Sequence, residues 1–200
     1  LDFSHCFSHF FTKNIYESLK NDTSFNIVGN KGTGRERLLE DIAALARQEG
    51  ITAIVANMNS WNHDYGGFIG HVQEQLLDTQ AALSTTALPA THQSSPHLSL
   101  MRQEHIVKHN HILLLLNNYD ALLNNPKQRF PKSFFDDLNA IKNKRKAYLR
   151  LCITTEISHR QCYIHYNDPA DNSRQKRSLS SLDLDKVDLP RPRMEEVRTE

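Results

Sequence analysis

A glycine-rich turn between an apolar run and a helical pattern constrains the fold of this chain more than any other feature. The apolar run covers residues 25–28, and residues 35–49 repeat leucine, isoleucine and alanine at helical spacing. Such an order predicts a buried strand, a loop, and a helix whose first backbone N–H groups point into the loop, which is an arrangement that binds phosphate. The residues of the turn are Gly29, Asn30, Lys31, Gly32, Thr33 and Gly34.

The spacing of the turn fits the P-loop pattern G-x-x-x-x-G-K-[ST], with Gly29 and Gly34 at its glycine positions. The next two positions depart from it, because Arg35 replaces the lysine and Glu36 replaces the Ser/Thr that binds magnesium. Arg35 still offers a cation to a phosphate, with a different reach and geometry. We expect Glu36 to weaken anion binding unless a metal or another cation intervenes, and we expect its carboxylate to cap the N–H groups of the helix in place of a phosphate. The pattern therefore predicts P-loop architecture without unaided ATP hydrolysis.

A second informative stretch is the strand expected at residues 111–116, whose apolar run from Ile112 to Leu116 predicts burial on both faces. In a P-loop ATPase an aspartate that supports magnesium and a glutamate that activates water follow such a strand. Here those positions hold Asn117 and Asn118. An amide is not a base and lacks the charge that magnesium prefers. Asp120 follows two residues on, and we expect it to cap the next turn rather than to replace the missing carboxylate.

Apolar strand runs alternate with amphipathic helical patterns along the chain. This alternation predicts an α/β, three-layer P-loop NTPase-like fold with a mainly parallel five-stranded sheet, in a single domain over residues 1–200. The strands are expected at residues 25–28, 51–58, 111–116, 148–155 and 179–189, and further helices at 4–20 (within an N-terminal helical segment, 1–22), 67–80, 98–109, 131–146 and from 193 onward. Flexible loops are expected at 81–97, rich in Ser, Thr and Pro, and at 156–178, which is polar.

Composition excludes several classes of protein. The net charge of +1 gives no global field that favours nucleic acid or a membrane surface, and no apolar run approaches the roughly 20 residues that span a bilayer. No secretory signal is visible. Cys6, Cys152 and Cys162 are few and scattered, which indicates a reducing, cytoplasmic compartment without a disulfide framework.

Histidine-rich and basic segments could also be read as metal-binding or nucleic-acid-binding sites. We interpret the histidine groups near residues 5–9 and 105–111 as ordinary surface residues, because a closed zinc site needs four ligands, and we expect no metal site. The basic residues at the end of the helix at 131–146 suit the helix dipole. A nucleic-acid patch is the alternative for them and for Arg174 to Arg177, although no aromatic platform accompanies the first group. That group is Lys142, Lys144, Arg145 and Lys146.

The glycine loop, the ILLLLNNYDALL run and the YLRLCITTE strand, in this order, resemble the core of the AAA+/STAND group of P-loop ATPases. The resemblance covers roughly residues 25–200. It implies that the strand at 25–28 lies between the last strand and the strand at 148–155, and that Thr154 or Thr155 is the polar sensor residue that faces the nucleotide. It also implies that SLDLDKVDLPRPRMEEV leads toward a helical lid, which we expect to be absent or truncated here.

Two functions from different classes follow from the resemblance. The departures fall on the positions that carry the chemistry, so the first is a catalytically inactive ATPase-like domain that requires no cofactor. It would act as a structural or regulatory subunit with protein partners, either an active ATPase paralogue or further copies of itself. The second is a nucleotide-binding AAA+/STAND ATPase or switch that holds ATP or ADP in an unusual site, with Lys31 and Asp120 in place of the missing groups, in a nucleic-acid-associated complex.

Overall fold

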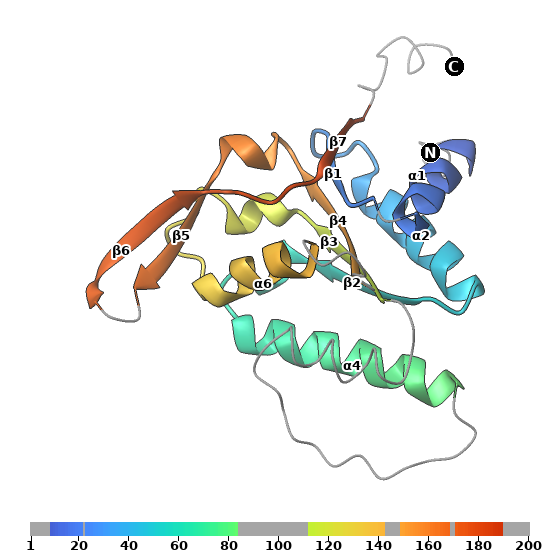
Figure 1. The fold of residues 1–200 in the computed structure, drawn as a ribbon, viewed down its shortest axis with the longest axis horizontal. Coiled ribbons are helices and arrows are strands. Elements are labelled where there is room, and N and C mark those ends of the chain that lie inside the picture. The colour runs from blue at the N-terminus through green and yellow to red at the C-terminus, as the bar shows by residue number, and fades with distance from the viewer. Residues whose placement is uncertain (1–8, 22, 84–111, 143–148, 169–170, 190–200) are drawn as a thin grey trace.

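A five-stranded parallel sheet forms the centre of the protein, as a computed structural model describes it for residues 9–21, 23–83, 112–142, 149–168 and 171–189 (Figure 1). The strand order is β2-β3-β4-β1-β7, and each neighbouring pair is parallel. The α/β fold class is confirmed, and β1 lies between β4 and β7 as expected. The strands are β1 (Phe25–Val28), β2 (Thr52–Asn57), β3 (Ile112–Asn117), β4 (Leu149–Thr155) and β7 (Asp185–Asp188).

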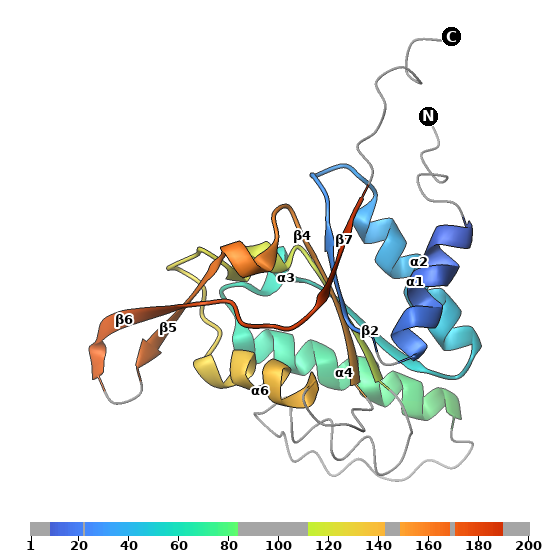
Figure 2. The ribbon, with the colours of Figure 1, turned by 45° about the horizontal axis from the view of Figure 1, so that its top comes forward.

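Helices cover both faces of the sheet (Figure 2). The α1 and α2 helices pack on one face, and α4 and α6 lie on the other. Their bounds are α1 (His9–Lys20), α2 (Arg35–Gln48), α4 (Tyr65–Leu83) and α6 (Lys132–Lys142), with the short helices α3 (Met58–Trp61), η1 (Tyr119–Leu122) and η2 (His159–Gln161). The loop predicted at 81–97 begins inside α4 and is otherwise outside the described residues, as are the helices predicted at 98–109 and from 193 onward.

The run of leucines in β3 explains the layering. Ile112, Leu114 and Leu116 belong to the apolar core under α4 and α6, whereas Leu113 and Leu115 belong to the core under α1 and α2. Every residue of β3 is buried. Since successive side chains of a strand point to opposite faces, a continuous apolar run is what a central strand between two helical layers requires.

The edge strand β2 is closed by two side chains of α4. The Val55 backbone N–H donates to Gln75 Oε1 at 3.0 Å, and Gln75 Nε2 donates to the Val55 carbonyl oxygen at 3.0 Å. The Nε2 atom of His71 lies 3.0 Å from the same carbonyl oxygen. Gln75 therefore satisfies both backbone polar groups of Val55, at the middle of an edge that another strand could otherwise pair with.

Residues 156–178, predicted as a loop, instead form η2 and a two-stranded antiparallel hairpin of β5 (Tyr163–Asp168) and β6 (Asp171–Leu179). In β5, Ile164 and Tyr166 pack against the core, whereas Tyr163 is exposed. Buried and exposed side chains therefore alternate along β5, as in a strand with one buried face. The polar residues of this segment made the alternation hard to detect in the sequence. The sequence of β6 has little apolar content of its own, so its conformation depends on pairing with β5.

The last predicted strand is shorter than expected. Only Asp185–Asp188 pairs with β1, as β7, although the alternation of leucines begins at residue 179. Leu182 and Leu184 are buried in the core under α4 and α6. The alternation therefore reflects a connecting segment that packs on the core before it joins the sheet.

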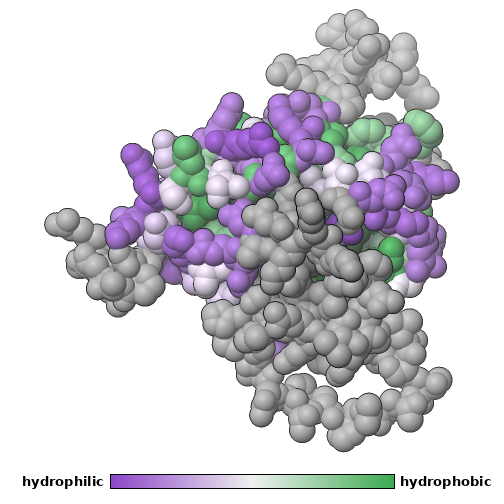
Figure 3. Space-filling model, in the orientation of Figure 1, coloured by the Kyte–Doolittle hydropathy of each residue, from purple (hydrophilic) through white to green (hydrophobic). Residues whose placement is uncertain are grey.

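Hydrophilic residues predominate among the coloured residues on the face shown in Figure 3. Within the described part of the chain, no helix has the length and apolar character needed to cross a membrane.

Candidate functional site

A cavity of about 520 Å³ opens where β3 and the glycine loop end. This is the edge at which open α/β sheets bind ligands, beyond the carboxyl ends of the parallel strands. Most of the predicted site residues line it, together with residues that sequence reasoning did not single out. The lining residues are Lys31, Gly32, Gly34, Arg35, Glu36, Arg37, Glu40, Asn59, Asn117 and Asn118.

The glycine loop has the backbone that its sequence predicts. Gly32 and Gly34 adopt positive φ angles of 79° and 78°, which residues with a side chain rarely adopt. Gly29 is needed for a different reason, since a Cβ atom there would lie 2.9 Å from Thr33 Oγ1 and 3.1 Å from Leu189. The buried Thr33 hydroxyl donates to the Asn30 carbonyl oxygen at 2.7 Å and closes the loop from inside.

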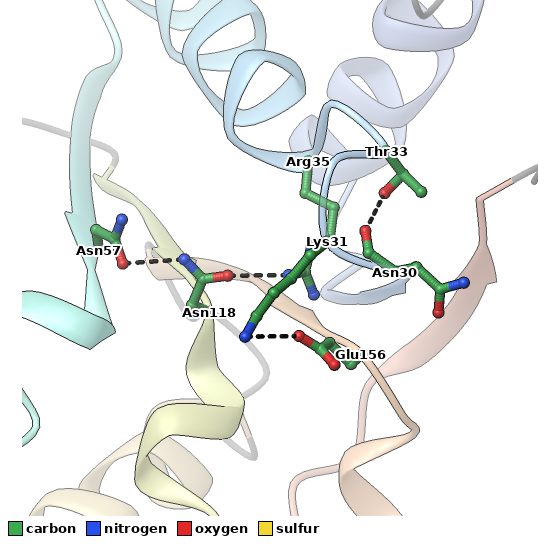
Figure 4. A network of polar contacts seen from close by, with 7 residues as sticks. All are labelled: Asn30, Lys31, Thr33, Arg35, Asn57, Asn118 and Glu156. Carbon is green, nitrogen blue, oxygen red and sulfur yellow. Dashed lines mark hydrogen bonds and ion pairs between the residues drawn. The ribbon is translucent and has the colours of Figure 1, made fainter. Parts of the chain in front are cut away.

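Arg35, at the lysine position, contacts the opposite wall of the cavity. Its Nη2 atom donates to Asn118 Oδ1 at 2.9 Å (Figure 4). The residue is only 5 % exposed, and its Nη1 atom is buried without a hydrogen-bond partner among the described residues. The replacements at two of the key positions are thus directly bonded to each other. A phosphate that used Arg35 would have to compete with Asn118 or accept from Nη1 alone.

Asn118 joins three strand ends. Its backbone is left-handed, with φ 52° and ψ 45°, a conformation that asparagine tolerates better than most residues. Its Nδ2 atom donates to Asn57 Oδ1 at the end of β2, at 3.0 Å. Its backbone N–H approaches Asn117 Oδ1 at 3.0 Å and Thr154 Oγ1 at 2.9 Å. Asn118 is therefore held by both neighbouring strands as well as by the glycine-loop helix.

Asn117 does not fit the role of a magnesium support. Its Oδ1 atom accepts from the Thr154 hydroxyl at 2.7 Å and from the Asn118 N–H, and the residue is buried. Both lone pairs of that oxygen are therefore used inside the protein. Glu36 stands where a hydroxyl would bind the ion. Across the described residues, no group of three or more His, Cys, Asp and Glu is placed to hold a metal ion.

The two candidate sensor residues have different surroundings. Thr154 belongs to the Asn117–Asn118 network just described. Thr155 instead supports the base of the glycine loop, where its hydroxyl accepts from Asn26 Nδ2 at 2.8 Å and its carbonyl accepts from the Gly29 N–H at 3.0 Å. Thr154 is the one placed to respond to a change at Asn118.

Three further charged residues lie near the loop. Glu36 is exposed and makes no hydrogen bond to another described residue, so the predicted cap by its carboxylate is wrong. Lys31, 80 % exposed, lies 3.6 Å from the Glu156 carboxylate rather than folding back into the loop. Asp120 lies within η1, and burial raises the pKa of its carboxyl. It is not among the residues that line the cavity.

Sequence reasoning missed Asn57, which contacts Asn118, and did not include Glu156, which contacts Lys31, among the site residues. Asn57 ends β2 and pairs with Asn117 at the end of β3, and Glu156 directly follows Thr155 at the end of β4. A search for polar residues at the carboxyl ends of all predicted strands would have found both, since those ends meet at one edge of a parallel sheet. Of the predicted basic group, Lys144, Arg145 and Lys146 lie outside the described residues.

No protein-family model and no curated protein matches the chain in sequence. Solved structures do match it in fold. A Walker-type ATPase of Pyrococcus abyssi superposes with a TM-score of 0.57 at 11 % identity, over 90 % of this chain and 52 % of that one. The ORC2 protein of Aeropyrum pernix in its ADP form gives a TM-score of 0.54 at 13 % identity, over 90 % of this chain and 47 % of that one.

The chain has a P-loop ATPase-like fold. It spans about half the length of both solved structures. At this level of identity the likeness concerns the fold, so the function of the chain has to be argued from its own cavity.

Proposed function

We propose that this P-loop ATPase-like domain does not hydrolyse ATP and acts as a structural or regulatory module that assembles with protein partners. The main observation that supports the proposal is the hydrogen bond between Arg35 and Asn118. Phosphoryl transfer depends on positioning and on charge neutralisation by a lysine, a metal ion and a residue that orients water. Two of those positions are here bonded to each other, and Asn117 uses its oxygen internally.

The second part of the proposal is that the domain assembles with protein partners. Phe10 on α1 is 72 % exposed, and this apolar side chain is the point at which we test for an assembly surface. Loss of catalytic groups with retention of the loop and core also fits a subunit that supplies shape rather than chemistry. The ORC2 neighbour is described in an ADP form, so nucleotide belongs to that protein and is a proposal only for this one.

A phosphate-release assay at high protein concentration tests whether the domain hydrolyses ATP. We expect wild-type protein with ATP and magnesium to match the Arg35→Ala variant, because Arg35 is engaged with Asn118. Magnesium-dependent turnover that disappears in Arg35→Ala would contradict the proposal.

The molecular mass in solution tests assembly. If α1 is an assembly surface, we expect a mass above that of the single chain. Phe10→Ser should lower this mass, whereas the matched exposed substitution Lys13→Ser on the same helix should not.

A specific observation favours a second candidate, a nucleotide-binding domain without hydrolysis. The Nη1 atom of Arg35 is buried and lacks a described hydrogen-bond partner, in a residue that lines a cavity of about 520 Å³. An unpaired buried donor is costly, and an anion oxygen would satisfy it. In that case ATP or ADP binds without magnesium at least as well as with it, because the residues present do not fit the metal ion.

A further inference from the structure

The β5–β6 hairpin extends away from the sheet and the helical layers (Figures 1 and 2). A single two-stranded hairpin is marginally stable by itself in water. This one is attached along β5 by residues 123–128. Leu123 bridges to Ile164, the Asn124 N–H donates to the Tyr163 carbonyl at 2.7 Å, and Gln175 Nε2 donates to the Pro126 carbonyl at 2.7 Å. The hairpin and residues 124–131 therefore lie next to each other in the fold.

These two segments are basic in a chain that is nearly neutral. Residues 124–131 and 163–179 contain five Lys and Arg and two Asp, a net charge of +3, whereas the whole chain carries +1. The rest of the protein is therefore net acidic. Within the described part of the chain, Lys127, Arg129 and Arg177 are exposed and have no carboxylate at ion-pair distance. Unpaired cations gathered at one end create a local field for a polyanion.

Aromatic and apolar side chains accompany the cations. The strand register pairs Tyr163 with Leu179 and His165 with Arg177, which places these side chains on one face of the hairpin. Tyr163 is 38 % exposed and Leu179 55 % exposed. The Arg177 guanidinium lies 4.9 Å from the centre of the Tyr163 ring. The other face, with Ile164 and Tyr166, packs against the core.

We infer that the hairpin face of Tyr163, His165, Arg177 and Leu179, together with Lys127 and Arg129 of the adjoining segment, binds nucleic acid. Cations that track phosphates and an exposed ring on which a base stacks are the two parts of a single-strand binding surface. The Arg177 guanidinium covers one face of the partly exposed Tyr163 ring, and the outer plane of this pair offers a base a stacking surface that an acidic protein segment does not need. The surface is separate from the nucleotide cavity, so the inference does not depend on whether the domain binds or hydrolyses ATP.

Charged residues on an edge strand have a second use, since they keep β6 from pairing with strands of other chains. That role alone predicts no affinity for nucleic acid. The two explanations therefore differ in a direct binding measurement, in which the salt dependence reports how many phosphates the protein contacts.

Fluorescence anisotropy of the full chain with a labelled oligothymidylate of about 20 nucleotides, enough to cover a typical single-strand site, tests the inference. The Lys127→Gln, Arg177→Gln double variant should bind about tenfold more weakly at low salt, with a slope of log K against log salt shallower by about 1.4, since each lost contact removes about 0.7. The control Lys13→Gln, Lys186→Gln removes the same charge from α1 and β7 and should bind like wild type.

Variants of Tyr163 and a competition measurement identify the class of ligand. Tyr163→Phe should keep the affinity for the single strand, and Tyr163→Ser should lower it several-fold while changing duplex binding little. Circular dichroism melts verify that each variant is folded. No binding by wild-type protein at low salt overturns the inference, as does an equal loss in the control variant. Competition by poly-glutamate as strong as by unlabelled oligothymidylate also overturns it, because the surface would then recognise acidic protein segments.

Discussion

Replacing Asn118 with glycine removes the Arg35 and Asn57 hydrogen bonds without disturbing the left-handed backbone at φ 52°. A hydrogen bond to a charged group contributes about 1.5–3 kcal/mol and a neutral one about 0.5–1.5 kcal/mol. Arg35 is 5 % exposed, so its guanidinium would lose its side-chain partner while it remains buried. We therefore expect Asn118→Gly to lower the free energy of unfolding by about 2–4 kcal/mol.

The same substitution has a smaller effect in the Arg35→Met background. That background removes the buried charge and the unpaired Nη1 atom together, so by itself it should stay within about 1 kcal/mol of wild type. In otherwise wild-type protein Asn118→Gly costs both bonds, whereas in the Arg35→Met background it costs only the Asn57 bond. The coupling energy of this double-mutant cycle should be about 1.5–3 kcal/mol.

Urea and thermal unfolding measure the cycle, at about 2–4 °C of Tm per kcal/mol for a chain of this size. Asn118→Ala is the matched variant for the backbone, and it should be less stable than Asn118→Gly by about 1 kcal/mol because alanine is strained in the left-handed region. Equal effects of Asn118→Gly in both backgrounds would refute the reasoning, since Arg35 and Asn118 would then be independent.

Three more predictions concern single side chains. Gly29→Ala should destabilise the fold by about 1–3 kcal/mol in urea unfolding, because its Cβ would meet Thr33 and Leu189 at 2.9 and 3.1 Å; a Gly70→Ala control, with open space around it, should not. Gln75→Leu should cost about 1–3 kcal/mol and increase light scattering on heating, because the Val55 N–H at the edge of β2 loses its partner and the Val55 carbonyl keeps only His71; an unchanged variant would show that the edge needs no cover. Asp120→Asn should be more stable than wild type at neutral pH, with the gain shrinking as the pH falls from the raised folded-state pKa toward the unfolded-state value of about 4. Burial raises the pKa of Asp120, so its contribution favours folding at low pH and is lost as the pH rises through the folded-state pKa; a difference that grows as the pH falls would have the wrong sign.

The strands of the central sheet could be predicted because their sequence and their environment agree. Ile112 to Leu116 are apolar throughout, and both faces of β3 are covered. The glycine loop was equally clear, since Gly32 and Gly34 take backbone angles that favour glycine. Such features are local, or follow from burial alone, so a single sequence contains them.

The hairpin and the polar network were less accessible for physical reasons. The conformation of β6 comes from pairing with β5 and from contacts with residues 123–128, which are distant in sequence. The partner of Arg35 is a residue 83 positions away, and the sequence showed both replacements without showing that they bond to each other. Glu36 was expected to cap α2, yet it lies exposed, because the helix begins at a left-handed glycine and its first turn opens on the cavity.

A thermal-shift titration with ATP and ADP, with and without magnesium, tests the central claim most directly. A ligand raises the melting temperature only when it binds the native state. Because Arg35 is held by Asn118 and Glu36 adds a negative charge at the cavity, we predict no shift for wild-type protein. The Arg35→Lys, Glu36→Thr variant should gain a shift but little hydrolysis, since Asn117 and Asn118 remain. A shift of several degrees in wild-type protein at micromolar ATP would contradict the account and favour a nucleotide-binding switch.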